Sequence, residues 1–137
     1  MIEGISHITF IVKDLDRTSN LLATVFGAEE VYTSGAKKHS YSKEKFFLVN
    51  GLWFAIMEGE PLSKKTYNHI ALKVAETDLE KYIERARSLG LEILEDRSRI
   101  SGEGKSLYFY DYDNHLFELH TGTLKQRLEV YGENEVI

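Results

Sequence analysis

The chain has 137 residues, of which 42% are hydrophobic and 12% aromatic, so it is long enough for one globular domain and too apolar for disorder. Its net charge of −5, with both signs interspersed, excludes a broad basic surface for nucleic acid or an anionic membrane. The absence of cysteine excludes disulfides, thiolate metal ligands and a cysteine nucleophile. No apolar run approaches the roughly 20 residues of a membrane span and no signal peptide is evident, so we expect a soluble cytoplasmic protein.

The first half of the chain alternates strand, helix and turn signals. A helix is predicted to begin after Asp14 or Asp16, either of which could cap it, and to end at Gly27. Asn50-Gly51, between two apolar runs, is the strongest short hairpin signal. The predicted strands are 5–12, 29–32, 46–49 and 53–57. A polar linker with the only proline, Pro61, follows.

The second half repeats the first. Residues 67–74 restate residues 5–12, with His69 standing 62 positions after His7. A helix is predicted from Thr77 or Asp78 to Gly90. Strands are predicted at 67–74, 91–94, 105–110 and 116–120, a glycine-rich loop at 101–105 and a short terminal helix near 124–131. The sequence therefore predicts an α+β fold of two pseudo-symmetric βαβββ modules, about 1–62 and 63–122, with a C-terminal helix at about 123–132, in one domain of residues 1–137.

The offset of 62 residues relates positions in the two modules. The predicted equivalent pairs are His7 with His69, Ile56 with Glu118, and Glu44 with Ser106. Matching first strands could bring the two histidines together about a pseudo-twofold axis. Glu118 could join them, whereas Ile56 could not coordinate anything, which leaves a set of three ligands.

Glu118 is the decisive residue of this set, because a strand rarely carries a charge on its inward face without a partner there. Two imidazoles and one carboxylate suit a divalent metal with open coordination positions, and these ligand types do not choose among manganese, iron, zinc, nickel and cobalt. His120 shares the strand face of Glu118 and is the main competing ligand. His39 is interpreted as an ordinary loop residue, and His115 as a surface or outer-layer residue.

These features resemble the vicinal oxygen chelate superfamily, which includes glyoxalases, extradiol dioxygenases and fosfomycin-resistance proteins. Within it, the chain from Gly4 to about Leu128 resembles the FosX group of fosfomycin-resistance proteins. The resemblance is carried by residues 67–71, 102–106, 108–111, 113–120 and 121–124. It implies a vicinal oxygen chelate fold in a homodimer whose subunits exchange modules, so that His7 and the pair His69 and Glu118 could come from different chains.

The resemblance also implies an activity. The group uses Mn²⁺, with other divalent metals possible, to add water to the epoxide of fosfomycin, a small phosphonate, which gives the diol and resistance. Carried over by position, His7, His69 and Glu118 are the metal ligands. Glu44 matches the glutamate that separates the water-adding group from its thiol-transferring relatives, and it is the expected general base.

A phosphonate dianion needs cations and hydroxyl groups that the net charge does not supply. The predicted substrate-binding residues are Thr9, Lys105, Ser106, Tyr108 and Arg127. Thiol-transferring relatives bind potassium near the glycine-rich loop, and Lys105 could replace that ion. The roles of Arg97, Arg99, Trp53 and Tyr67 stay open: each could line the pocket or serve only the loop or the core.

Three alternatives share parts of this pattern. A thiol transferase acting on fosfomycin would use the same metal site without needing Glu44 as a base. A dioxygenase or lyase would have no use for the cluster of anion-binding residues. A drug-sequestering module would need no metal. We expect fosfomycin and water as the small-molecule partners, a homodimer, and no nucleic acid or membrane partner.

Overall fold

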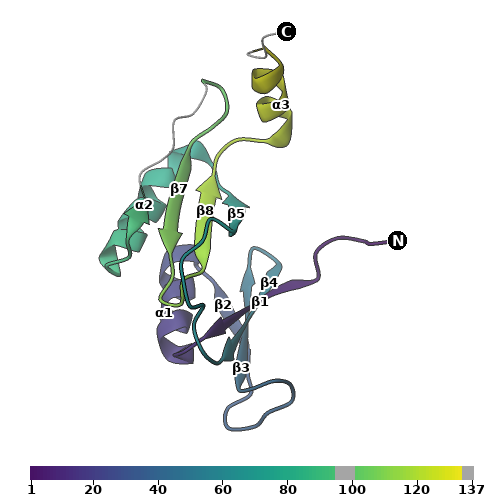
Figure 1. The fold of residues 1–137 in the computed structure, drawn as a ribbon, viewed down its shortest axis with the longest axis vertical. Helices are drawn as coiled ribbons and strands as arrows, with labels where there is room; N and C mark the ends of the chain where they lie inside the picture. The colour runs from purple at the N-terminus through teal and green to yellow at the C-terminus, as the bar shows by residue number, and fades with distance from the viewer. Residues whose placement is uncertain (95–100, 134–137) are drawn as a thin grey trace. The chain divides into compact units, whose positions relative to one another are not determined.

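The computed structural model describes residues 1–94 and 101–133, and this part of the chain forms two compact units. The first unit comprises residues 1–66 and 111–115, and the second comprises residues 67–110 and 116–137. The described residues hold two four-stranded mixed sheets and three α-helices, which confirms the α+β class (Figure 1). None of these helices is long and apolar enough to cross a membrane. The division into modules 1–62 and 63–122 of one domain stays a prediction.

The first unit has the order strand, helix, three strands. Its elements are β1 (His7–Val12), α1 (Leu15–Phe26), β2 (Glu29–Thr33), β3 (Glu44–Val49) and β4 (Leu52–Glu58). The sheet order is β1-β4-β3-β2, with β1 parallel to β4. The Asp14 side chain caps α1 by accepting the Arg17 amide at 3.0 Å, and Gly27 ends the helix in the left-handed conformation.

The second unit repeats this order. Its elements are β5 (His69–Lys73), a 3₁₀ turn η1 (Glu76–Asp78), α2 (Leu79–Ser88), β6 (Ile93–Leu94), β7 (Ser106–Tyr110), β8 (Leu116–His120) and the additional α3 (Leu124–Glu133). The sheet order is β5-β8-β7-β6, again with the first pair parallel. Both units thus build the predicted βαβββ arrangement from strands of matching order.

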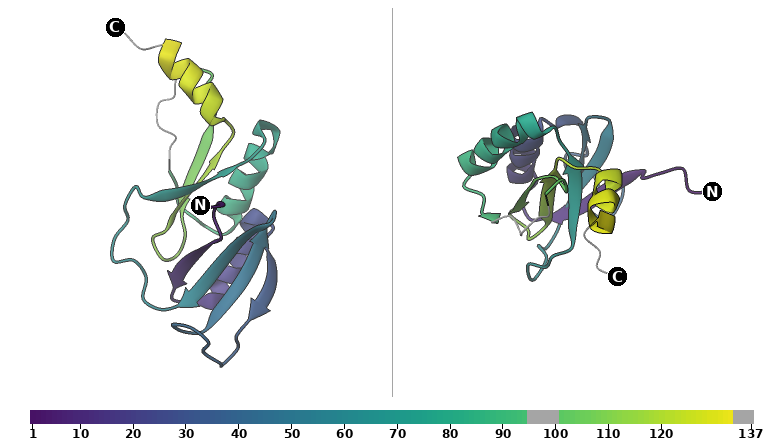
Figure 2. Two further views of the ribbon diagram at one scale, coloured as in Figure 1. Left: turned by 90° about the vertical axis from the view of Figure 1, so that its right-hand side faces the viewer. Right: turned by 90° about the horizontal axis from the view of Figure 1, so that it is seen from above.

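One face of each sheet is covered by its own helix, and the other face carries the predicted site residues. In the first unit, α1 lies along one face of the sheet (Figure 2). Phe47, Phe54 and Ile56 are buried on this face. Side chains alternate along a strand, so His7 and Thr9 lie on the opposite face, where both are exposed. The strand β3 begins at Glu44, two residues before its predicted start, which puts Glu44 on this open face opposite Met57.

The strand registers correct the predicted partner of Glu118. His7 pairs with Trp53 and His69 pairs with Leu116, so the offset between β4 and β8 is 63 residues, not the 62 that separate the first strands. The cause is the hairpin turn. Five residues, 111–115, separate the Tyr110–Leu116 pair, whereas four residues separate the equivalent Leu48–Trp53 pair.

Glu118 is therefore equivalent to Ala55, and the predicted match with Ile56 is wrong. Ile56 faces the helix and is fully buried. The Ala55 methyl group cannot coordinate a metal either, so the first unit still has no acid at this position. The equivalence of Glu44 and Ser106 holds, because Glu44 pairs with Met57 and Ser106 pairs with His120.

The longer turn, residues 111–115, belongs to the first unit. Asp111 Oδ1 accepts the amides of Asp113 and His115, and Asp113 Oδ1 accepts the Lys13 amide at 2.9 Å. Burial raises the pKa of Asp113. His115 Nδ1 donates to Asp111 Oδ2 at 2.8 Å, so His115 stabilises this turn.

Replacing Ile56 tests the corrected assignment. Ile56→Ala leaves a cavity beneath α1, and we expect it to lower the free energy of unfolding by about 2–5 kcal/mol in denaturant titrations. Ile5→Ala is the matched control, because Ile5 is 72% exposed. Equal stability of the two variants would contradict the assignment of Ile56 to the helix-covered core.

Candidate functional site

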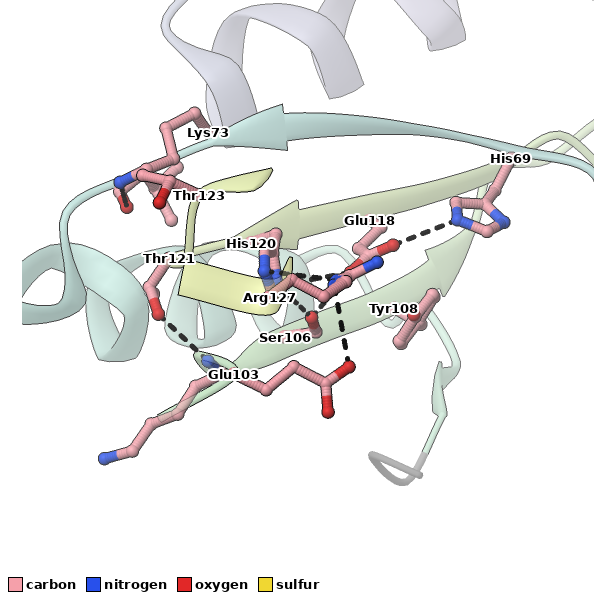
Figure 3. A network of polar contacts seen from close by, with 12 residues as sticks. His69, Lys73, Glu103, Ser106, Tyr108, Glu118, His120, Thr121, Thr123 and Arg127 are labelled. Carbon is pink, nitrogen blue, oxygen red and sulfur yellow. Dashed lines mark hydrogen bonds and ion pairs between the residues drawn. The ribbon is translucent and has the colours of Figure 1, made fainter. Parts of the chain in front are cut away.

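The second unit places His69 and Glu118 in direct contact. His69 Nε2 lies 3.0 Å from Glu118 Oε1 (Figure 3). His69 Nδ1 lies 2.7 Å from the Tyr67 carbonyl oxygen. A carbonyl only accepts hydrogen bonds, so Nδ1 carries the proton. Nε2 is the ring nitrogen that faces the carboxylate, and in the neutral tautomer with the proton on Nδ1 it carries the lone pair.

This pair fits a divalent cation. Two acceptor atoms facing each other need a proton or a cation between them, and the buried Glu118 side chain is only 5% exposed. An imidazole nitrogen and a carboxylate oxygen are both ligand types that divalent ions accept, so the two side chains together could hold one. Among the residues described, no group of three acids or histidines comes together as a metal site.

A second layer of hydrogen bonds fixes the other oxygen of Glu118. Ser106 Oγ donates to Glu118 Oε2 at 2.6 Å. Since this uses the only hydroxyl proton, His120 Nδ1 donates to Ser106 Oγ at 2.7 Å. His120 Nε2 can then accept from Arg127 Nη2 at 3.4 Å. In this arrangement His120 supports Glu118 through Ser106. The hydroxyl proton of Ser106 is used in the hydrogen bond to the Glu118 carboxylate.

The network continues into the glycine-rich loop and α3. Arg127 Nε lies 3.6 Å from Glu103 Oε1, and the Tyr131 hydroxyl donates to the same oxygen at 2.6 Å. Glu103 is 1% exposed. The sequence interpretation missed Glu103 and Tyr131, because nothing local marks a loop glutamate as buried.

Arg127, His69 and Glu118 line one small cavity of about 280 Å³ within the second unit. Its lining residues are His69, Ala71, Glu118, His120, Gly122, Thr123, Leu124 and Arg127. The cavity thus combines two ligand-type side chains with a cation. That combination suits an anionic molecule bound beside a metal ion.

Two glycines allow the loop to approach β8. A Cβ at Gly122 would lie 2.3 Å from the Glu103 carbonyl oxygen, and a Cβ at Gly104 would lie 2.7 Å from the Gly122 nitrogen. No other residue fits at either position without moving the backbone. The close approach holds Glu103 beside the end of β8.

The remaining predicted residues of the second unit have other partners. Lys105 Nζ pairs with Glu76 Oε1 at 2.8 Å on the surface, and this contact raises the pKa of Lys105. Lys105 is not among the residues lining the cavity, so the suggestion that it replaces potassium gains no support. The Tyr108 hydroxyl accepts from the Tyr67 hydroxyl at 3.1 Å, on the sheet face that carries Glu118.

In the first unit, Glu44 is a buried carboxylate without a partner. It is 7% exposed, and within residues 1–94 and 101–133 its side chain makes no hydrogen bond or ion pair. Both oxygens are therefore available to a water molecule or a ligand.

His7 lies on the same open face as Glu44. Its ring packs on Trp53 at 4.2 Å, and its Nδ1 contacts Ser6 Oγ at 3.0 Å. This leaves Nε2 without a partner in the described part of the chain. Trp53 is thus a neighbour of a predicted ligand, and Tyr67, which is 59% exposed, is not a core residue. Arg97 and Arg99 lie outside the described residues.

The fold and these side chains correspond to a known family. The family model "Glyoxalase/Bleomycin resistance protein/Dioxygenase superfamily" matches residues 4–119. The chain belongs to this superfamily.

Within the superfamily, the chain is similar to fosfomycin resistance proteins named FosX. It is 60% identical to FosX of Listeria innocua over 96% of this chain and 98% of the relative. It is 56% identical to FosX of Mesorhizobium japonicum over 93% of this chain and 92% of the relative. It is also 33% identical to the metallothiol transferase FosB of Staphylococcus saprophyticus, over 98% of this chain and 87% of the relative.

Solved FosX structures share the fold. A crystal structure of a FosX variant from Listeria monocytogenes, in complex with Mn(II) and 1S,2S-dihydroxypropylphosphonic acid, superposes with a TM-score of 0.88 at 55% identity, covering 96% of this chain and 99% of the other. FosX from Mesorhizobium loti superposes with a TM-score of 0.85 at 53% identity, covering 94% and 99%.

Removing the Ser106 hydroxyl tests its support of Glu118. Ser106→Ala deprives Glu118 Oε2 of its donor, and we expect the affinity for Mn²⁺ to fall about 10–100-fold in titration calorimetry. Ser88→Ala, which removes an exposed hydroxyl bonded to the Arg85 carbonyl, is the control. An unchanged Mn²⁺ affinity in Ser106→Ala would show that Glu118 does not need this donor.

Proposed function

We propose that this chain is a Mn²⁺-dependent hydrolase that adds water to the epoxide of fosfomycin, gives the diol phosphonate and so confers resistance. The observation that carries the proposal is the His69–Glu118 pair. It occurs in a chain 55% identical to a FosX protein whose crystal structure contains Mn(II) and the dihydroxypropylphosphonic acid.

The proposed metal ligands are His7, His69 and Glu118. Their donor types suit Mn²⁺ or a related divalent ion, and His7 and His69 begin the equivalent strands β1 and β5. When bound, the metal ion acts as a Lewis acid on the epoxide oxygen and helps to orient the substrate.

Glu44 is the proposed general base. Its carboxylate has no partner among the described residues, so it is available to take a proton from a water molecule. The water oxygen forms a bond to the epoxide carbon that bears the phosphonate, the bond from that carbon to the ring oxygen breaks, and the ring oxygen gains a proton. The product is the diol, and no covalent enzyme intermediate is needed.

Arg127 is the proposed main contact of the phosphonate. It lines the cavity with His69 and Glu118, and its side chain is one-third exposed. Thr9, Lys105, Ser106 and Tyr108 remain proposed substrate contacts from the sequence. Of these, Lys105, Ser106 and Tyr108 already have protein partners, so they would have to share or exchange them on binding.

We further propose that the working unit is a homodimer with exchanged modules, in which His7 of one subunit completes the site of His69 and Glu118 of the other. The open sheet faces support this, because His7 and His69 are both exposed on them. A location in the cytoplasm stays a prediction from the sequence.

Glu44→Gln tests the proposed base. The amide cannot take a proton, so we expect diol formation from fosfomycin to fall about 10²–10⁴-fold, while Mn²⁺ affinity is retained. The measurement is ³¹P NMR of fosfomycin with Mn²⁺, with and without added thiol, and Glu58→Gln, an exposed glutamate on β4, is the control. A product that forms only with thiol would identify a thiol transferase, and binding without turnover or metal would identify a sequestering module.

Mixed dimers test the exchange of modules. His7→Ala and Glu118→Ala homodimers should both be inactive, but a mixed dimer regains one complete site if His7 acts across the interface. After the subunits are mixed in equal amounts and allowed to exchange, we expect about a quarter of the wild-type activity per site. No recovery, with exchange verified by native mass spectrometry, would place all three ligands in one subunit.

A further inference from the structure

We infer that Glu103 is a positioning residue, which together with Tyr131 fixes the Arg127 guanidinium so that its free donors face the anion in one orientation. The inference rests on the proposed function, because it concerns how the site of that reaction holds its phosphonate. Glu103 contacts Arg127, which lines the cavity, and we infer that it acts through that arginine.

Glu103 is a buried carboxylate in the glycine-rich loop. A carboxylate that is 99% removed from solvent is costly unless charged and polar partners satisfy it. The Tyr131 hydroxyl at 2.6 Å and Arg127 Nε at 3.6 Å both meet Oε1. Two side chains of α3 therefore meet the same oxygen of this buried carboxylate.

Arg127 is held along one edge only. Its Nε faces Glu103, and its Nη2 faces His120 Nε2 at 3.4 Å (Figure 3). A guanidinium has five N–H donors. Both hydrogens of Nη1 have no partner in the described part of the chain. A guanidinium that is held along one edge points its remaining N–H donors in one direction. Donors arranged in this way can bind a tetrahedral oxyanion.

Close contacts hold both the loop that carries Glu103 and the helix α3 that carries its partners. Its carbonyl oxygen lies where a side chain at position 122 would clash, so the loop is seated directly on Gly122. Tyr131 follows Arg127 by four residues and therefore shares its helix face. The start of α3 is fixed by a reciprocal cap, in which the Thr123 amide donates to Gln126 Oε1 and the Gln126 amide donates to Thr123 Oγ1.

Two effects of Glu103 oppose each other, and two substitutions separate them. Its charge weakens the attraction of Arg127 for an anion, while its contacts fix where Arg127 points. Glu103→Gln keeps the length and an acceptor oxygen but removes the charge. Glu103→Asp keeps the charge but is one methylene shorter, so it cannot reach Tyr131 and Arg127 together.

The experiment uses full-length protein with Mn²⁺ and measures kcat and KM for fosfomycin, the inhibition constant of inorganic phosphate, Mn²⁺ affinity and the melting temperature. We expect Glu103→Asp to raise KM and the phosphate inhibition constant about tenfold, while kcat and Mn²⁺ affinity stay within about threefold of wild type. Tyr131→Phe should shift the same constants in the same direction. Glu103→Gln should stay within about threefold in all of them, as should the control Glu80→Asp, an exposed glutamate of α2.

Four outcomes overturn the inference. Unchanged KM and phosphate inhibition in Glu103→Asp would show that Arg127 does not depend on it. Equal effects of Glu103→Gln and Glu103→Asp would show that the reach of the side chain is not what matters, because Glu103→Gln keeps that reach. A joint loss of kcat, Mn²⁺ affinity and melting temperature in Glu103→Asp would mark a general structural role. If the wild-type protein neither binds phosphate nor forms the diol, the proposed function fails and the inference fails with it.

Discussion

The carboxylate of Glu118 sets the main constraint on the second unit. A buried negative charge must be satisfied at both oxygens, and here Oε1 faces His69 while Oε2 accepts from Ser106. The rest of the polar network follows from this need. Ser106 Oγ accepts a hydrogen bond from His120 Nδ1, and His120 Nε2 lies 3.4 Å from Arg127 Nη2. The chain of contacts therefore links a proposed metal ligand to the cation that lines the same cavity.

The duplicated fold gives the two units unlike open sheet faces. Each unit covers one sheet face with a helix and leaves the other open, and the open faces carry different chemistry. The first holds His7, Thr9 and an unpaired Glu44, and the second holds His69, Glu118 and their supporting network. Glu44 and Ser106 occupy equivalent positions, so the proposed base and the hydroxyl that supports Glu118 come from the same place in the repeat. Duplication followed by divergence of the open faces is enough to separate these roles.

The extra residue in the second hairpin turn changes which residues of β4 and β8 are equivalent. A shift of one position moves a side chain to the other face of a strand. The uniform offset of 62 residues paired Glu118 with Ile56, which the structure buries beneath α1, whereas the true equivalent is Ala55. This correction does not change the three-ligand hypothesis, because alanine and isoleucine are equally unable to bind a metal.

The sequence by itself determined what depends on local chemistry. Asp14 and Gly27 bound α1, Asn50-Gly51 turns a hairpin with both φ angles positive, and the repeat predicted the βαβββ order. The sequence also singled out His69 and Glu118. Histidine and glutamate are metal-ligand types, and their places on repeated strands can be recognised from the sequence alone.

Only the tertiary structure decided which side chains meet. It paired Lys105 with Glu76, committed Ser106 to Glu118, and buried Glu103 between Arg127 and Tyr131, 24 and 28 positions along the chain. Such contacts depend on strand register and on the close seating of the loop against Gly122. Neither leaves a local pattern in the sequence, because both are properties of packing between distant segments.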